Sequence, residues 1–344
     1  MDSRAKAPRA LSSSVWILLL PRDGQKGLEM APLKVLISGA TGVVGRRLVP
    51  ILVSGGHQVT AIARAHGKRE EFARMGAAAI VADLLDARSL IKAVRGFDAV
   101  VNLATHMPSS MAQTIKRSAW KENDLLRSQG SANLVDAALA GGVGRFIQES
   151  FAPVYPDCGE RWIEEDIPIQ PVKYNETIAD AERSAVRFTA GGGTGVVLRY
   201  AGFYGPDSRF LLESIPLVRN GREFLPGSPD GYVSSVSHDD AATATAAALT
   251  VPAGVYNVVD DEPVTHREYF ATLAQALGVP PPKPLPRWTR WFMGSIGELL
   301  SRSQRISNRK LKSASRWTPR YPSVREGWPE VVAALPQENG FAAA

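Results

Sequence analysis

The amino-acid sequence predicts an α/β protein with a Rossmann-like, doubly wound parallel sheet and a smaller, interleaved C-terminal substrate domain. Three observations lead to this prediction. Short apolar strand patterns alternate with helical patterns, a glycine-rich turn joins the first strand to the first helix, and small or polar residues follow the strands. At 344 residues the chain is also large for a single hydrophobic core, which favours a main domain plus a smaller one.

Each predicted element has its own local pattern. Apolar runs typical of strands occupy residues 33–38, 57–63, 77–81, 98–103, 145–149 and 195–200, with a further strand near 254–259. Helical periodicity occupies residues near 43–54, 68–75, 86–95, 118–141 and 175–190. Such alternation predicts helices on both faces of a parallel sheet, with ligands at the carboxyl ends of the strands.

The same patterns predict how the chain is divided. We expect residues 31–200 to form a dinucleotide-binding Rossmann domain to which the strand near 254–259 is added. Residues 201–253 and 260–328 are expected to form the smaller substrate-binding region, and residues 329–344 a flexible tail.

The glycine-rich turn lies within residues 36–48, where an apolar run enters and a helical pattern leaves. Glycines in such a turn permit unusual backbone angles, let a phosphate approach the main chain and let the helix lie close to the strand. The helix N-terminus then faces the pyrophosphate of a dinucleotide. A strand-to-helix turn without a ligand is the alternative. The expected cofactor contacts are Gly39, Thr41, Gly42, Val43, Val44 and Gly45.

Arg64 ends the second predicted strand, at the position where Rossmann folds distinguish their two cofactors. An acid there bonds the ribose 2′-OH of NAD, whereas an arginine accommodates the 2′-phosphate of NADP. Three further basic or imidazole side chains follow before Glu70, and a charge-assisted bond is worth roughly 1.5–3 kcal/mol. NADP is therefore the expected cofactor and NAD the alternative, unless this basic stretch is only a solvated loop.

Two further segments follow predicted strands and are expected to contact the cofactor. Asp83 and Leu84 follow the third strand, where an acid can meet the adenine edge. Asn102, Leu103 and Ala104 follow the fourth, where small residues let the chain run beside the nicotinamide ribose. Ordinary turn chemistry is the alternative for both, because Asp and Asn favour loops.

Composition excludes several classes of protein. The single cysteine, Cys158, excludes an intramolecular disulfide and favours a cytoplasmic protein, and no Cys/His cluster has metal-ligand spacing. In the first thirty residues the only apolar run, at 15–20, is too short to span a membrane. We expect a non-native or disordered leader that ends near Met30, with a weak membrane-surface anchor as the alternative.

The net charge of +6 is distributed unevenly, because residues 283–325 hold eleven lysines and arginines and one acid. Nucleic-acid binding is nevertheless not expected. The apolar residues of this segment are spaced like the buried face of an amphipathic helix, whose basic residues would form a solvated cover. That predicted face consists of Trp288, Trp291, Phe292, Ile296, Leu299 and Leu300.

Further motifs follow in order: the segments at 154–157, 198–206, 237–240 and 255–259, and Tyr174 before a helix. Together with the glycine turn, they resemble the extended short-chain dehydrogenase/reductase family, also described as NAD-dependent epimerase/dehydratase, over about residues 33–328. The resemblance implies an NAD(P)-dependent oxidoreductase or epimerase acting on a small molecule. In that family the helices near 118–141 and 175–190 are the natural surface for pairing into a homodimer, while the sequence leaves the oligomeric state of this chain open.

In that family a serine and a Tyr-x-x-x-Lys pair carry the chemistry. The tyrosine exchanges a proton with the substrate, while the lysine holds the nicotinamide ribose and lowers the tyrosine pKa. The resemblance assigns the tyrosine to Tyr174, but Ile178 stands at the lysine position and Phe151 at the serine position. Ser150 could substitute only where its strand ends or bulges, because neighbouring strand residues point to opposite faces.

A third departure concerns an active-site asparagine. Arg127 stands at its position, and Asn123 lies one helical turn earlier. Surrogates for the missing groups are His106, Arg127, Glu149 and Glu176, although for each one alone a solvated or structural role is favoured. Lys173 adjoins Tyr174 but would point away from it on a helix.

The missing lysine favours one direction of reaction. A tyrosine without help has a pKa near 10, so about one in a thousand is ionised at pH 7. Oxidation or epimerisation needs the ionised form, whereas reduction of a carbonyl uses the neutral hydroxyl. We therefore expect an NADPH-dependent reductase with Tyr174 as proton donor. A protein that binds NADP without hydride transfer and a sugar-nucleotide epimerase or dehydratase are the alternatives.

Overall fold

The computed structural model describes residues 31–64, 68–108, 110–286 and 288–335, so the predicted leader lies outside the described residues. Its centre is a seven-stranded sheet in which every neighbouring pair is parallel, in the order β11-β7-β5-β4-β1-β2-β3. Each predicted strand is present within two residues at either end. The strands are β1 (Lys34–Ser38), β2 (Gln58–Ala63), β3 (Ala78–Val81), β4 (Ala99–Asn102), β5 (Arg145–Phe151), β7 (Thr194–Tyr200) and β11 (Gly254–Val258).

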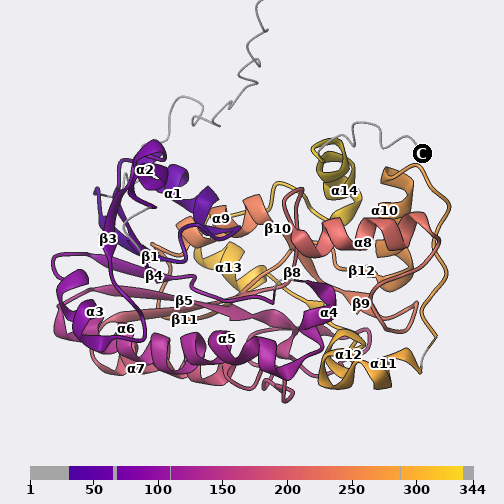
Figure 1. The fold of residues 1–344 in the computed structure, drawn as a ribbon, viewed down its shortest axis with the longest axis horizontal. Coiled ribbons are helices and arrows are strands. Elements are labelled where there is room, and N and C mark those ends of the chain that lie inside the picture. Colours follow the sequence, from indigo (N-terminus) through magenta and orange to yellow (C-terminus); the bar gives the residue numbers. More distant parts are fainter. Residues whose placement is uncertain (1–30, 65–67, 109, 287, 336–344) are drawn as a thin grey trace, which may run out of the picture. The chain divides into compact units, whose positions relative to one another are not determined.

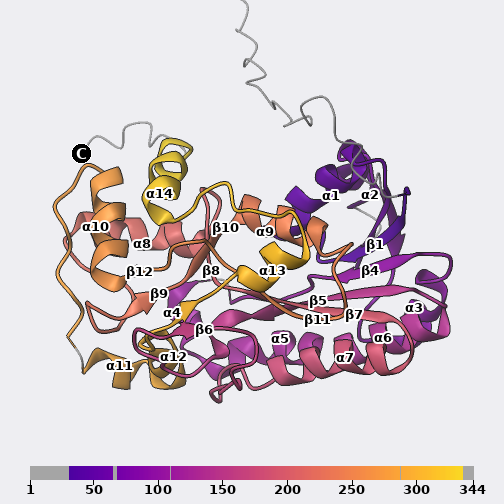
Figure 2. The same ribbon diagram turned by 180° about the vertical axis from the view of Figure 1, so that it is seen from behind.

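Helices cover both faces of this sheet (Figures 1 and 2). Successive strand residues point to opposite faces, so Val35 and Ile37 join one apolar core while Leu36 joins the other. One core is completed by α1 (Gly45–Ser54), α2 (Arg69–Arg74), α9 (His238–Ala247) and α13 (Arg309–Ala314). The other is completed by α3 (Ala87–Ala93), α6 (Ser131–Ala140) and α7 (Ile178–Ala190). The predicted doubly wound fold is therefore confirmed.

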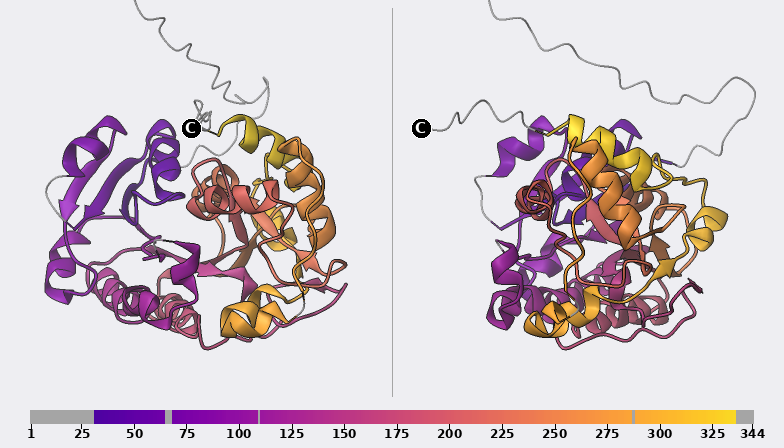
Figure 3. Two further views of the ribbon diagram at one scale, coloured as in Figure 1. Left: turned by 45° about the vertical axis from the view of Figure 1, so that its right-hand side comes forward. Right: turned by 90° about the vertical axis from the view of Figure 1, so that its right-hand side faces the viewer.

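A third apolar core lies beside the sheet, where the orange and yellow segments gather in Figure 3. It is built by α8 (Arg209–Arg219), α10 (His266–Ala276) and α14 (Val324–Ala333). The pair of β9 (Tyr232–Val233) with β12 (Val264–Thr265) packs on it, and Tyr204 joins it from the pair of β8 (Gly202–Tyr204) with β10 (Ser235–Ser237). A further pair, β6 (Trp162–Ile163) with β13 (Arg305–Ile306), contributes Ile163 and Ile306 to the first core instead. In the described part of the chain no helix is both long and apolar enough to cross a membrane.

The predicted division of the chain needs two corrections. Helix α9 falls within residues 201–253, yet it packs on α1 and contributes alanines to the core of the sheet. Helix α14 continues to Ala333 and buries Val331, so the structured chain extends past residue 328. The broader assignment of the remaining segments to a substrate-binding region stays a prediction.

The helix predicted near 118–141 is built from four consecutive pieces. A 3₁₀ turn (Arg117–Trp120) and α5 (Lys121–Leu125) precede a π-helical turn (Leu126–Gly130), and α6 follows. A π-helical turn adds a residue to the helix, which shifts the side chains on either side of it and is frequent at functional sites. Helix α4 (Met111–Thr114) precedes these pieces.

The predicted amphipathic helix in the basic segment is wrong for its aromatic half. Trp288, Trp291 and Phe292 are 57%, 74% and 77% exposed, whereas Ile296 and Leu299 are buried. The segment consists of two short helices, α11 (Thr289–Phe292) and α12 (Gly294–Leu300). Gly294 has a φ of +58°, and this left-handed residue breaks the periodicity on which the prediction depended.

Candidate active site

The turn between β1 and α1 brings together the three glycines of the predicted motif. Gly39 has a φ of +74°, and its carbonyl accepts a hydrogen bond of 3.0 Å from the N–H of Gly42. A Cβ on Gly39 would lie 2.4 Å from the Leu103 carbonyl oxygen, and one on Gly45 would lie 2.3 Å from the Gly39 carbonyl oxygen. Gly39 and Gly45 are therefore required by the close packing of the protein itself.

Gly42 is different, because a Cβ there would meet only the Gly39 carbonyl oxygen, at 3.2 Å. Gly42 and Thr41 are exposed, and Val43 is half-buried beside them. Helix α1 starts with no side-chain cap, and although the N–H groups of Arg46 and Arg47 bond the carbonyls of Gly42 and Val44, the positive end of the helix dipole faces this turn. The turn therefore presents a cradle that a side chain would fill, and it fits the pyrophosphate of a dinucleotide.

These two kinds of glycine predict two different mutant phenotypes. Gly45→Ala should lower the free energy of unfolding by several kcal/mol, because the new methyl group would overlap backbone atoms. Gly42→Ala should change it by about 1 kcal/mol or less but weaken dinucleotide binding at least tenfold. Urea unfolding and cofactor titration measure the two effects. Equal loss of stability in both variants would contradict this account of Gly42.

Asn102, the last residue of β4, and Asp83, which follows β3, both make hydrogen bonds within the protein at the carboxyl ends of their strands. The Asn102 side chain is buried and accepts a 2.6 Å bond from the Ser38 hydroxyl, while its amide donates to Ser131 and to Gln148. Asp83 accepts a bond from the Leu85 N–H, which is turn chemistry. The cofactor contacts predicted for Asp83, Leu84, Asn102, Leu103 and Ala104 remain predictions; the Asn102 side chain is engaged by the protein.

Arg64 lies immediately after β2, at the position predicted for recognition of a 2′-phosphate. Its side chain is 65% exposed and donates through Nη1 to Glu122 Oε1 over 2.6 Å. His106 approaches the same oxygen, with Nδ1 at 3.3 Å. Arg64 is thus accessible to a ligand but already has an acidic partner.

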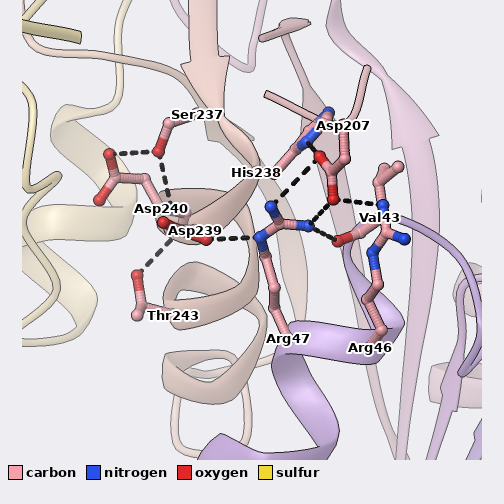
Figure 4. Close-up of polar contacts among 9 residues, drawn as sticks. All are labelled: Val43, Arg46, Arg47, Asp207, Ser237, His238, Asp239, Asp240 and Thr243. Carbon is pink, nitrogen blue, oxygen red and sulfur yellow. Dashed lines mark hydrogen bonds and ion pairs between the residues drawn. The ribbon is translucent and has the colours of Figure 1, made fainter. Parts of the chain in front are cut away.

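An ionic cluster, missed by the sequence reasoning, fastens the start of α1 to the loop after β8 (Figure 4). Arg47 donates to both oxygens of Asp207, at 2.9 and 3.2 Å, and also bonds Asp239; Arg46 pairs with Asp207 as well. His238 Nδ1 lies 2.8 Å from Asp207. Although burial opposes it, hydrogen bonds from His238 and Arg47 hold the pKa of Asp207 well below its usual range.

A sequence signal for this cluster exists. Two consecutive arginines in the first turn of α1 are unfavourable beside the positive end of the helix dipole. Their presence therefore predicts that carboxylates from elsewhere in the chain neutralise them. Asp207, 160 residues from Arg47, supplies the main one. The cluster therefore couples the glycine turn to the segment that leads into the third core.

Tyr174 lies in a turn before α7, which begins only at Ile178. Its ring meets Trp120 edge to face, with the ring centroids 4.4 Å apart. Arg117 fastens this turn by donating to the backbone carbonyl of Lys173 over 2.6 Å and to Glu176 over 3.0 Å. No hydrogen bond to the Tyr174 hydroxyl comes from the residues that the structure describes.

Burial raises the pKa of Tyr174 to about 12, against the opposing effect of the nearby Arg127 cation. Ile178, at the family's lysine position, is fully buried. Tyr174 and Ile178 do not share a helical turn, because the helix starts after the tyrosine. The hydroxyl is therefore held in its neutral form and has no lysine beside it at that position.

Arg127 and Glu149 form an ion pair close to Tyr174. Arg127 Nη2 lies 3.2 Å from Glu149 Oε1, and the two side chains are only 6% and 12% exposed. Arg127 comes from the π-helical turn and Glu149 from β5. Arg127 Nε and Glu149 Oε2 are buried without a partner among the described residues. Of the four predicted surrogates, these two are brought together beside the tyrosine, whereas His106 pairs with Glu122 and Glu176 with Arg117.

The structure does not support Ser150 as the replacement serine. Strand β5 continues without a bulge through Phe151, with Ser150 opposite Arg199 and Phe151 opposite Tyr200. The Ser150 hydroxyl donates to Glu182 over 2.6 Å, inside a buried network with Arg199. Its alternation therefore directs Ser150 into the core, and we correct its assignment from a catalytic to a structural residue.

The model of the NAD-dependent epimerase/dehydratase family matches residues 35–258. A 3-diazoavenalumate denitrifying reductase from a Streptomyces species is 32% identical over 319 residues, which cover 86% of this chain and 99% of that protein. A 2-alkyl-3-oxoalkanoate reductase from Stenotrophomonas maltophilia is 28% identical over 287 residues, or 78% of this chain and 83% of that protein.

Solved structures show the same architecture. The UDP-glucose 4-epimerase of Thermus thermophilus, solved as a complex with NAD, superposes with a TM-score of 0.69 at 27% identity. The superposition covers 88% of this chain and 98% of that one. The likeness therefore extends over most of the length of both chains.

Proposed function

This chain belongs to the NAD-dependent epimerase/dehydratase family, and we propose that it is an NADP(H)-dependent reductase of a small carboxylate metabolite, with Tyr174 as the proton donor. The observation that carries this proposal is the environment of Tyr174. Its hydroxyl has no hydrogen-bond partner among the described residues, its pKa is raised to about 12 by burial, and Ile178 stands where the family has lysine. A tyrosine kept neutral is suited to give a proton and poorly suited to take one.

The residues that would hold the dinucleotide are those of the glycine turn. The cradle beside Gly42 and the uncapped start of α1 fit a pyrophosphate, and Arg64 fits a 2′-phosphate. When bound, reduced nicotinamide supplies a hydride. Tyr174 would donate its proton to the substrate oxygen as that hydride arrives, and the resulting phenolate would be stabilised by the nearby Arg127 cation.

The relatives narrow the substrate class. The two relatives described above are named as reductases of carboxylates, one of a diazo compound and the other of 3-oxo acids. We propose that this chain likewise reduces a small carboxylate that carries a carbonyl or diazo group. A panel of 3-oxo carboxylates, aryl diazo carboxylates, neutral ketones and sugar nucleotides, followed by NADPH absorbance, would rank these classes.

One observation favours a second function, dinucleotide binding without hydride transfer. Phe151 and Ile178 replace two family side chains, and Ser150 does not restore the first of them. A redox sensor or a different enzyme on the same scaffold would retain the glycine turn and lose the chemistry. Tight NADPH binding without turnover of any panel member would favour this alternative.

Arg64→Ala tests the cofactor preference. We expect the unaltered protein to bind NADPH more tightly than NADH, and the variant to lose most of the difference, about 10- to 150-fold for a charge-assisted bond. Intrinsic tryptophan fluorescence follows the titrations. Arg267→Ala, which removes an exposed, ion-paired arginine from the surface of α10, is the control. Equal affinities of the unaltered protein for both cofactors would refute the preference.

A further inference from the structure

Arg64, Glu122 and His106 form a bridge across the carboxyl edge of the sheet. Arg64 directly follows β2, and His106 lies four residues beyond the end of β4. In the sheet, β1 lies between these two strands. Since neighbouring strands are ~4.8 Å apart, the bridge spans about 10 Å above the end of β1. The glycine turn starts there, so the bridge crosses the place where this fold binds ligands.

The two partners of the bridge differ in how firmly the protein holds them: Glu122 is fixed more tightly than Arg64. Glu122 is on α5, and its neighbour Asn123 is buried and accepts a 3.0 Å bond from the His106 N–H. Arg64, by contrast, is 65% exposed and is held to Glu122 through one nitrogen only. An exposed ion pair contributes only about 0.2–1 kcal/mol, so a phosphate can take Arg64 from its partner.

We propose that Glu122 competes with the 2′-phosphate of the cofactor for Arg64 and thereby limits the preference for NADPH over NADH. This inference rests on the proposed function, in which Arg64 recognises that phosphate. Binding of NADPH breaks the Arg64–Glu122 pair, and it brings a phosphate dianion near a carboxylate that no longer has its cation. NADH carries a neutral hydroxyl at the same place, so its binding neither breaks the Arg64–Glu122 pair nor brings a second negative charge near Glu122. Glu122 is therefore a specificity-determining residue that acts against the preferred cofactor.

The test is Glu122→Gln, which keeps the shape of the side chain and removes its charge. We expect the dissociation constant for NADPH to fall by about 2- to 5-fold at low salt, from the energy of one exposed ion pair. The constant for NADH should change by less than that, and the gain should shrink at high salt as the charges are screened. Glu262→Gln is the matched control, because Glu262 also forms an exposed ion pair, 2.8 Å from Arg325.

The double variant Arg64→Ala/Glu122→Gln tests whether the effect passes through Arg64. In the Arg64→Ala background, Glu122→Gln should lower the NADPH constant by a smaller factor than in the unaltered protein, because no ion pair is left to break and only the repulsion between the carboxylate and the phosphate is removed. Weaker or unchanged NADPH binding by Glu122→Gln alone, or an equal gain for NADH, would overturn the proposal. A thermal melt of each variant ensures that only folded proteins are compared. If the unaltered protein binds NADH as tightly as NADPH, it is the proposed cofactor preference that fails, and the two failures are distinct.

Discussion

Tyr174→Phe should reduce turnover by about 10²–10⁴ while leaving NADPH binding nearly unchanged, the usual contribution of one positioned proton donor. The structure makes this variant conservative. The Tyr174 hydroxyl has no protein partner in the described part of the chain, and its ring packs edge to face on Trp120, which phenylalanine can reproduce. Stability should therefore stay within about 1 kcal/mol, as for a substitution that keeps the packing.

The pH dependence of the rates of reduction and oxidation distinguishes Tyr174 acting as a proton donor from Tyr174 acting as a base. With a pKa raised to about 12, the neutral hydroxyl persists at all pH values well below 12, so reduction should not lose its acid between pH 6 and 10. The ionised form grows tenfold per pH unit over the same range, so any oxidation through Tyr174 should rise with that slope. Steady-state rates in both directions provide the measurement. Turnover that is indifferent to Tyr174→Phe would instead favour dinucleotide binding without hydride transfer.

The sheet could be predicted closely from the sequence because buried parallel strands are continuous apolar runs. The run that forms β1, for example, is bounded by Lys34 and the Gly39 turn. The exposed Trp291 and Phe292 could not be predicted, since the helical periodicity was counted through Gly294, whose positive φ interrupts it. A periodicity argument holds only as far as the helix is continuous.

The candidate site was predictable only in part, because some of its residues are neighbours in the sequence and others are brought together by the fold. The glycine turn is local, so its residues and spacing stand together in the sequence. Arg127 and Glu149 are 22 residues apart on a π-helical turn and a strand, and no spacing rule links these elements. The position of Tyr174 outside α7 depends on bonds from Arg117, which lies 56 residues from Lys173. Because these residues come from elements that are distant in the sequence, the sequence indicates each of them as a candidate but does not predict which of them are in contact.

Arg127→Met should lower the free energy of unfolding by about 3–5 kcal/mol, because it leaves the Glu149 carboxylate buried without its cation. Glu149→Leu should have a similar cost by leaving Arg127 unpaired. The double variant Arg127→Met/Glu149→Leu replaces both charges with apolar groups, so it should recover most of the lost stability. Urea unfolding of the four proteins gives the coupling between the two side chains.

Turnover should follow a different pattern, because Arg127 also stabilises the phenolate that Tyr174 forms after giving its proton. Each protein without Arg127 should therefore reduce substrate more slowly by about tenfold or more, the order of loss expected when one group that stabilises a developing anion is removed. The double variant should thus be nearly as stable as the unaltered protein and still slow. A double variant with restored turnover would mean that the ion pair only holds the fold together. One that stays slow identifies Arg127 as the residue that positions charge beside Tyr174, in place of the lysine that Ile178 has replaced.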